Sequence, residues 1–289
     1  MTAVGDRTRG LLAPASDTID ADARVAVRDV LVARLAPLVA PLPPGAPVVV
    51  GLPLLRQVRT RPETLAVPDE PFAWRPVFVR RSLGLAVVAA CARGRFRNPL
   101  DAVGPVMTEA VDRWRETGWR TYHWEPWVAG LAPGARAVVQ AEAVGWASSL
   151  WAALDWSQFD ALPQIGGNDD SWACPAAHTL RLKGRPELRV PLAAAPSADR
   201  HPGDRGAVAL VSLTSGHPPD AWREELAYLA LVAALGSPSR PVPARVLGLW
   251  PDAGAVRSVE VDEDALSGAA DLVVATVAAV VEARRPVPV

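Results

Sequence analysis

Apolar positions recur at two different spacings along the chain. In five stretches they return every three or four residues with charged residues between them, which predicts amphipathic helices. These helices are expected at residues 20–39, 80–94, 99–118, 133–154 and 264–283. Elsewhere apolar residues alternate with polar ones or form short unbroken runs, and these patterns predict strands at residues 178–183, 187–192, 207–213, 244–250 and 255–263. The chain is therefore predicted to be an α+β protein.

The order of these elements predicts three parts. Residues 1–76 hold the N-terminal helix and an irregular connector, residues 77–160 form a helical region, and residues 170–289 contain the main strands. Within the first part, residues 48–55 are expected to form a short strand, and residues 56–76 are rich in proline, arginine and glutamate. The helical N-terminal part is expected to pack against the strands.

A loop is predicted between the helical region and the strands. Residues 163–175 are rich in glycine, asparagine and aspartate, which are common in turns. Asp169 and Asp170 are adjacent in this segment. We interpret them as turn residues, with a metal-binding role as the alternative.

Residues 178–250 show the clearest order of elements, which is strand, turn, strand, loop, strand, helix, strand. The Gly-Arg-Pro sequence at residues 184–186 separates the first two strands and predicts a hairpin. Residues 207–213 form an almost unbroken apolar run, so we expect a central strand that is hydrogen-bonded on both sides. A helix over residues 219–235 is expected to pack on that strand.

Three short motifs follow this order: GRPE at residues 184–187, SLTSG at residues 212–216 and EELAY at residues 224–228. Their order resembles that of the PD-(D/E)XK nuclease superfamily, and within it the RecB-like nuclease domains. That family has Gly-x-x-Asp, Asp-x-Lys-Thr-Gly and Gln-x-x-x-Tyr in these places. The resemblance implies a restriction-endonuclease-like mixed β-sheet with flanking helices. It assigns the family's motif positions to Glu187, Ser212, Thr214, Glu224 and Tyr228.

Two of these positions lack the residue types that the family uses for catalysis. Nuclease members need two carboxylates to hold a divalent cation and a lysine near the attacking water. Ser212 and Thr214 stand where the family has the second acid and the lysine, and Lys183 is the single lysine of the chain. We therefore expect a catalytically degenerate protein without a metal or another cofactor.

An enzyme remains the alternative to this prediction. In that case Glu187 and Lys183 would form a rebuilt active site, with Asp169 or Asp170 as the second acid and Mg²⁺ as the cofactor. The proximity of Lys183 and Glu187 across a tight turn motivates this alternative.

The basic residues around the hairpin allow two interpretations. Arg181, Lys183, Glu187 and Arg189 can form cross-strand pairs on a solvated face. Alternatively, Arg181, Lys183, Arg185 and Arg189 contact the phosphates of a nucleic acid. Because the resemblance implies a role in DNA processing, we expect a module that binds DNA or a protein partner.

Composition narrows the class of protein. The net charge of −1 gives no overall attraction to nucleic acid, so binding would need a local cluster of arginines. Two cysteines are too few for a disulfide framework, a four-thiolate zinc site or an iron–sulfur cluster. No signal peptide and no uncharged apolar run of about 18 residues is present, so we expect a soluble cytoplasmic protein with no membrane partner.

Tryptophan is unusually frequent in the helical region. The chain has 11 tryptophans, and seven of them lie between residues 114 and 156. They can fill gaps between helices that are rich in alanine and valine, or they can form a platform for unpaired bases. The segment WRTYHWEPW, residues 119–127, is the expected contact surface. A third functional hypothesis is a protein-interaction scaffold that uses these helices and binds no nucleic acid.

Overall fold

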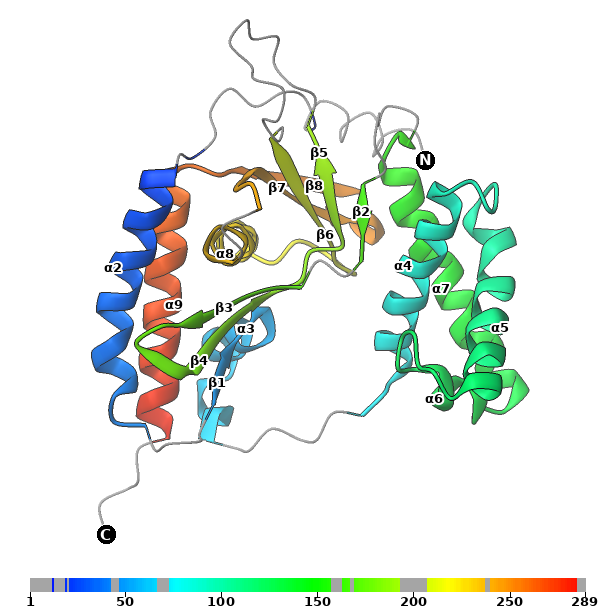
Figure 1. The fold of residues 1–289 in the computed structure, drawn as a ribbon, viewed down its shortest axis with the longest axis horizontal. Helices are drawn as coiled ribbons and strands as arrows, with labels where there is room; N and C mark the ends of the chain where they lie inside the picture. The colour runs from blue at the N-terminus through cyan, green and yellow to red at the C-terminus, as the bar shows by residue number, and fades with distance from the viewer. Residues whose placement is uncertain are drawn as a thin grey trace, which may run out of the picture. The chain divides into compact units, whose positions relative to one another are not determined.

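The structure is a computed structural model, and it describes residues 12, 19, 21–42, 47–66, 73–156, 163–166, 169–192, 207–236 and 240–284 (Figure 1). Its internal contacts separate two compact units. We call them the helical unit, within residues 70–167, and the mixed unit, within residues 11–69 and 168–289. Helices and mixed β-sheets are both present, so the predicted α+β class is confirmed.

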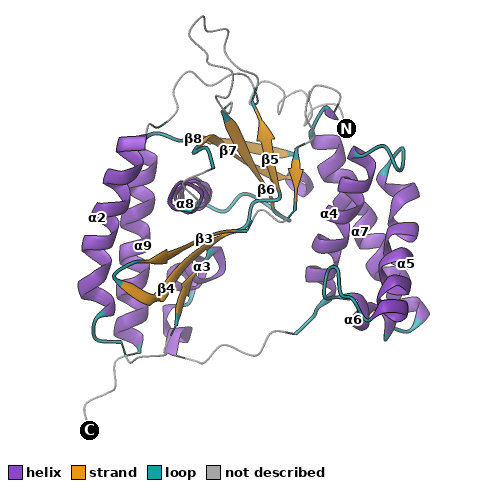
Figure 2. Ribbon diagram, in the orientation of Figure 1, coloured by secondary structure: helices purple, strands orange, loops and turns teal. Residues whose placement is uncertain are grey.

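Three long helices that contact one another form the helical unit, as Figure 2 shows. They are α4 (Pro76–Ala92), α5 (Pro99–Thr117) and α7 (Pro133–Ala153). The short helix α6 (Glu125–Ala129) contacts α5, and the two-residue strand β2 (Gln164–Ile165) contacts α4. The three helices predicted from the apolar spacing of this region are confirmed.

The tryptophans of the helical unit are mostly packed into it. Trp124 is fully buried, and its indole N–H donates to the hydroxyl of Ser82 at 3.2 Å. The rings of Trp151 and Trp156 stack with their centroids 4.8 Å apart. The contact of Trp124 with α4 supports the interpretation that tryptophans fill space between the helices, whereas the Trp151–Trp156 stack lies at the end of α7. Trp119 is different, because 69% of it is exposed.

The mixed unit contains helices and two sheets. Its helical elements are α2 (Ala21–Val39), α3 (Leu52–Thr60), η1 (Pro62–Ala66), α8 (Trp222–Leu235), η3 (Pro251–Ala253) and α9 (Glu263–Ala283). Its strands are β1 (Val48–Val50), β3 (Asp170–Cys174), β4 (Ala177–Gly184), β5 (Leu188–Pro191), β6 (Val208–Leu213), β7 (Pro243–Trp250) and β8 (Ala255–Glu260).

The strands of the mixed unit pair in two groups. In the first sheet, β4 is parallel to β1 and antiparallel to β3. In the second sheet, β5, β6, β7 and β8 are hydrogen-bonded in this order. Strand β6 is antiparallel to β5 and parallel to β7, so it has hydrogen-bonded neighbours on both sides. The prediction that residues 207–213 form a central strand is confirmed.

Helix α8 lies at the centre of the mixed unit, where Figure 1 shows it end-on. Every residue from Glu225 to Leu235 is buried. The helix contacts β7 and β8 of the second sheet, β3 and β4 of the first sheet, and α9. A helix that is apolar all round needs partners on every side, which explains this central position. Leu210 of β6 belongs to the same core as α8, but within the second sheet α8 packs mainly on β7 and β8 and not on β6, the strand on which it was expected to pack.

Helices α2 and α9 lie side by side and cover α8 (Figure 1). Among the described helices, α9 is long and apolar enough to span a membrane by length and composition. However, Leu266, Val273 and Val277 are fully buried in the core that α9 shares with α2 and α8. Its apolar stripe is therefore accounted for by packing inside the unit. Both helices were predicted from their apolar spacing.

The predicted hairpin between residues 178–183 and 187–192 is wrong. Strand β4 belongs to the first sheet and β5 to the second, so the Gly-Arg-Pro segment connects two sheets. The antiparallel partner of β4 is β3, which lies in the segment predicted to be a loop. Asp170 is therefore a strand residue and not a turn residue.

The segment after β1 also differs from its prediction. Strand β1 ends at Val50, and α3 begins at Leu52 with Pro53 in its first turn, a position that proline favours. Helix α3 and η1 occupy most of the predicted irregular connector, of which residues 67–72 lie outside the described part. Leu55 is buried while its polar neighbours face outward, which stabilises α3 on the core.

Candidate functional site

Glu187 lies just before β5, beside the end of β6. In β5, Leu188 pairs with Val211 of the antiparallel strand β6. Its backbone N–H donates to the carbonyl of Val211 at 2.8 Å, and its side-chain Oε2 accepts the N–H of Leu213 at 2.8 Å. Glu187 is only 1% exposed. The carboxylate is thus bound to the backbone of β6, next to the two family positions on that strand.

The SLTSG segment is fixed at the end of β6. The N–H of Thr214 donates to the carbonyl of Leu249 at 2.9 Å, and the N–H of Gly216 donates to Asp252 at 2.8 Å. Gly216 has a φ of 82°, which favours glycine. Ser212 is buried. The loop therefore presents hydroxyl groups and backbone beside one buried carboxylate.

This arrangement offers little to a divalent cation. No group of three or more histidine, cysteine, aspartate or glutamate side chains that could hold a metal occurs in the described part of the chain. Glu187 already accepts a backbone N–H, and Ser212 and Thr214 carry neutral side chains. Such a donor set does not fit Mg²⁺, which needs several oxygen ligands including carboxylates.

Tyr228 and Glu224 do not form a shared surface. They lie one turn apart on α8, but Glu224 is exposed and Tyr228 is fully buried. The Tyr228 hydroxyl donates to the carbonyl of Val50 at 2.7 Å and accepts the N–H of Lys183 at 3.2 Å. Burial raises the pKa of Tyr228 well above its ordinary value. Tyr228 therefore joins α8 to β1 and β4 as a neutral structural residue.

Glu225, which follows Glu224 on α8, makes a contact that was not predicted from the sequence. Glu225 is buried, and its carboxylate accepts two hydrogen bonds from Arg56 of α3, at 2.7 Å and 2.6 Å. The hydrogen bond that Arg56 donates to Glu225 is the largest cause of the raised pKa of Arg56. The only sequence signal was an acid next to the apolar stripe of α8, and Arg56 stood in a segment predicted to be irregular.

Arg189 is not available to a nucleic acid, which corrects its predicted role. It is buried in the mixed unit and pairs with Asp170 of β3. Arg240 approaches the other oxygen of Asp170 at 2.9 Å. Arginines therefore occupy both oxygens of Asp170, and the exposed Asp169 pairs with Arg185 at 3.0 Å. Neither aspartate lies free to act as a second acid for Glu187.

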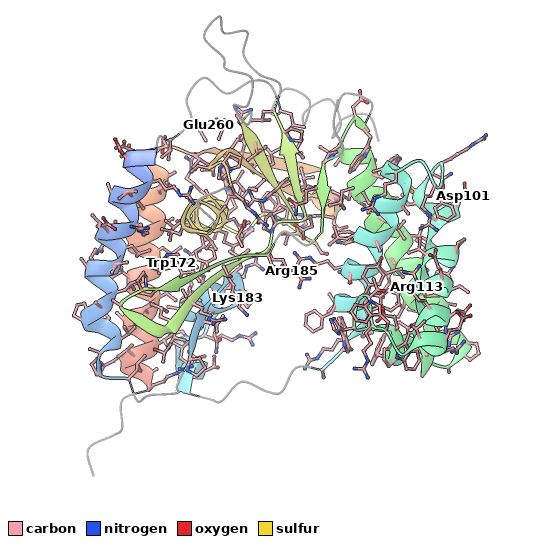
Figure 3. All side chains as sticks on the ribbon, in the orientation of Figure 1. Asp101, Arg113, Trp172, Lys183, Arg185 and Glu260 are labelled. Carbon is pink, nitrogen blue, oxygen red and sulfur yellow. The ribbon has the colours of Figure 1, made fainter. Side chains whose placement is uncertain are left out.

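The outward side of β4 carries two cations. Leu180 and Leu182 point into the core, so the alternating Arg181 and Lys183 point outward, and both are exposed. Neither has a carboxylate partner among the described residues. Arg185, also exposed, continues the row beyond β4. Figure 3 shows Lys183 and Arg185 near each other on this segment.

Uncharged residues surround these cations within the sheet. Arg181 lies between Val49 of β1 and Ala173 of β3, and Lys183 is opposite Ser171 of β3. Val49, Ala173 and Ser171 are all exposed. We call the side of the first sheet that bears Arg181 and Lys183 the β4 face.

The chain was compared with three sets of known proteins. Known family models, curated proteins and solved structures gave no match to the chain. The resemblance to PD-(D/E)XK nucleases therefore rests on the motifs GRPE, SLTSG and EELAY and on their order along the chain.

The structure separates the two parts of the alternative rebuilt active site. Lys183 is exposed on β4 in the first sheet, whereas Glu187 is buried and bound to β6 in the second sheet. The backbone of Lys183 is held by Tyr228. A shared exposed site for the Lys183 ammonium group and the Glu187 carboxylate is not formed in this arrangement.

Proposed function

We propose that this chain is a non-catalytic nucleic-acid-binding module with a PD-(D/E)XK-like, RecB-like mixed sheet, acting in DNA processing in the cytoplasm. The observation that carries the proposal is the β4 face. Arg181 and Lys183 are exposed there, and neither has a carboxylate partner among the described residues. The proposal needs no metal and no other cofactor.

The electrostatics of the β4 face suit a phosphate backbone. Residues two apart on a strand project to the same side roughly 7 Å from each other. Arg181 and Lys183 therefore form a row of positive charge, and Arg185 extends it while sharing its charge with Asp169. With a whole-chain net charge of −1, attraction to a polyanion has to come from local groups of positive charge such as this row.

A matched pair of double variants tests the proposal. Arg181→Ala/Lys183→Ala removes the row, while Arg223→Ala/Arg257→Ala removes two exposed cations from α8 and β8 of the same unit. Fluorescence anisotropy with a labelled DNA duplex at low salt should show a loss of about tenfold or more for the first variant only, because two phosphate contacts disappear. Equal affinities of the two variants would remove the basis of the proposal.

The chain is also expected to lack metal-dependent nuclease activity. Ser212 and Thr214 provide neither a carboxylate for a cation nor a cation beside the nucleophile, and each loss ordinarily lowers the rate by several powers of ten. Single- and double-stranded DNA would be incubated with the protein in Mg²⁺ and in Mn²⁺, and no cleavage is expected.

The control for the nuclease assay is Glu187→Gln. Its amide oxygen can still accept the N–H of Leu213, so the fold is retained while the charge is removed. Cleavage by the wild type that this variant lacks would contradict the non-catalytic proposal and support the rebuilt active site with Mg²⁺.

A further inference from the structure

Strand β3 adds a hydroxyl group to the cations of the β4 face. In the antiparallel register of β3 and β4, Ser171 is directly opposite Lys183, and Arg181 is its diagonal neighbour. Ser171 is exposed, whereas the residues on either side of it in β3 are buried. Because side chains alternate along a strand, Ser171 projects to the same side of the sheet as Lys183 and Arg181.

The side chains of Ser171, Lys183 and Arg181 are close enough to contact one phosphate group. Directly opposite residues of an antiparallel sheet have their Cβ atoms about 4.5–5.5 Å apart, and diagonal neighbours are about 7–8 Å apart. A phosphate above β3 can therefore accept the short Ser171 hydroxyl while the longer side chains of β4 reach it from the neighbouring strand. Serine, lysine and arginine side chains are all common donors to phosphate oxygens.

The three donor groups are not paired with other described residues. Within the described part of the chain, the Ser171 hydroxyl has no hydrogen-bond partner, and Arg181 and Lys183 have no carboxylate partner. Strand β3 is the last of the described strands on its side of the sheet. A long ligand that crosses Lys183 can therefore continue over Ser171 and past the edge of the sheet.

A carboxylate near these groups is neutralised by an arginine. Asp169, two residues before Ser171, is exposed and pairs with Arg185 at 3.0 Å. This pair follows Lys183 along the two strands, on the side away from Arg181. Lys183 and Arg181 therefore keep their positive charges around the Ser171 hydroxyl.

We infer that Ser171 is a phosphate-binding residue of the β4 face, whose hydroxyl donates to a phosphodiester oxygen that Lys183 and Arg181 attract. This inference rests on the proposed function and adds to it a contact that carries no charge. A hydroxyl supplies a hydrogen bond but releases no counterion from the nucleic acid. It should therefore add to the affinity and leave the salt dependence of the affinity unchanged.

The test compares Ser171→Ala with two controls. Ser171→Thr keeps a hydroxyl in a residue that is common in strands, and Ser267→Ala removes an exposed hydroxyl from α9 of the same unit. Binding of a labelled DNA duplex is measured by anisotropy across a salt series. Ser171→Ala should weaken binding by about 2- to 10-fold at every salt concentration, with the slope of the wild type. Both controls should bind as the wild type does.

The Arg181→Ala/Lys183→Ala variant is measured in parallel, so that failure of the inference differs from failure of the proposed function. If Ser171→Ala binds as tightly as the wild type while the double variant is weakened, the inference fails and the proposed function stands. If neither variant changes binding, or the wild type binds no duplex, both fail. A smaller slope for Ser171→Ala, or an equal loss in Ser171→Thr or Ser267→Ala, would also overturn the inference.

Discussion

Asp170→Asn should lower the free energy of unfolding of the mixed unit by about 3–5 kcal/mol, because breaking a buried ion pair leaves an uncompensated charge. Asp170 is buried and accepts hydrogen bonds from Arg189 and Arg240. Arg189 is itself buried, so its guanidinium cannot turn to water when the carboxylate is neutralised. The midpoint of urea denaturation measures the loss.

The neighbouring aspartate provides the control. Asp169 is exposed and pairs with the exposed Arg185, so Asp169→Asn should change stability by about 1 kcal/mol or less. The two substitutions make the same chemical change at adjacent positions and differ in burial. Similar midpoints for both variants would show that the Asp170 cluster does not stabilise the unit.

Gly84→Ala should destabilise the helical unit. A Cβ atom at Gly84 of α4 would lie 2.3 Å from Cε3 of the Trp146 ring on α7, far closer than van der Waals contact allows. Forcing extra volume into a packed site costs about 1–3 kcal/mol, which outweighs the better helix propensity of alanine. Gly145→Ala on α7 is the control. Its Cβ would meet nothing within 4 Å, and the change should stabilise the helix by about 0.5–1 kcal/mol.

Each unit has one free, buried cysteine, so the rate of alkylation of each cysteine shows which unit a substitution destabilises. Cys91 lies on α4, and Cys174 lies on β3. Burial raises the pKa of Cys91 to about 11, so very little reactive thiolate is present near neutral pH. Gly84→Ala should speed alkylation of Cys91 more than that of Cys174. If Gly84→Ala and Gly145→Ala are equally stable, α4 and α7 do not cross as closely as described.

Helices were predictable because their signal is local. Apolar spacing sets the buried side of α2, α5, α7 and α9, and Gly118 marks the end of α5. Strand β3 was missed because its sequence, DSWAC, follows several glycine, asparagine and aspartate residues, which are typical of loops. Its alternation of buried and exposed residues results from its pairing with β4, which the local sequence does not show. The Gly-Arg-Pro segment has the composition of a hairpin turn, and local sequence cannot distinguish that from a connection between sheets.

The site was predictable only in part, for the same reason. The position of Glu187 beside β6 agrees with the predicted strand order, and Arg181 and Lys183 share one side because a strand alternates. The pair of Arg56 with Glu225 joins residues 169 positions apart. The pair of Arg240 with Asp170 joins residues 70 apart. Such pairs depend on how the elements pack, and no spacing in the sequence encodes them.

The most direct test of the binding account is the dependence of DNA affinity on salt. The logarithm of the association constant for a duplex is measured against the logarithm of salt concentration. Wild type and Arg223→Ala/Arg257→Ala should give the same steep slope. Arg181→Ala/Lys183→Ala should give a slope smaller in magnitude by about 1.8, since each phosphate contact contributes about 0.9. Identical slopes for all three proteins, or binding that does not change with salt, would contradict the account and favour a protein-interaction scaffold.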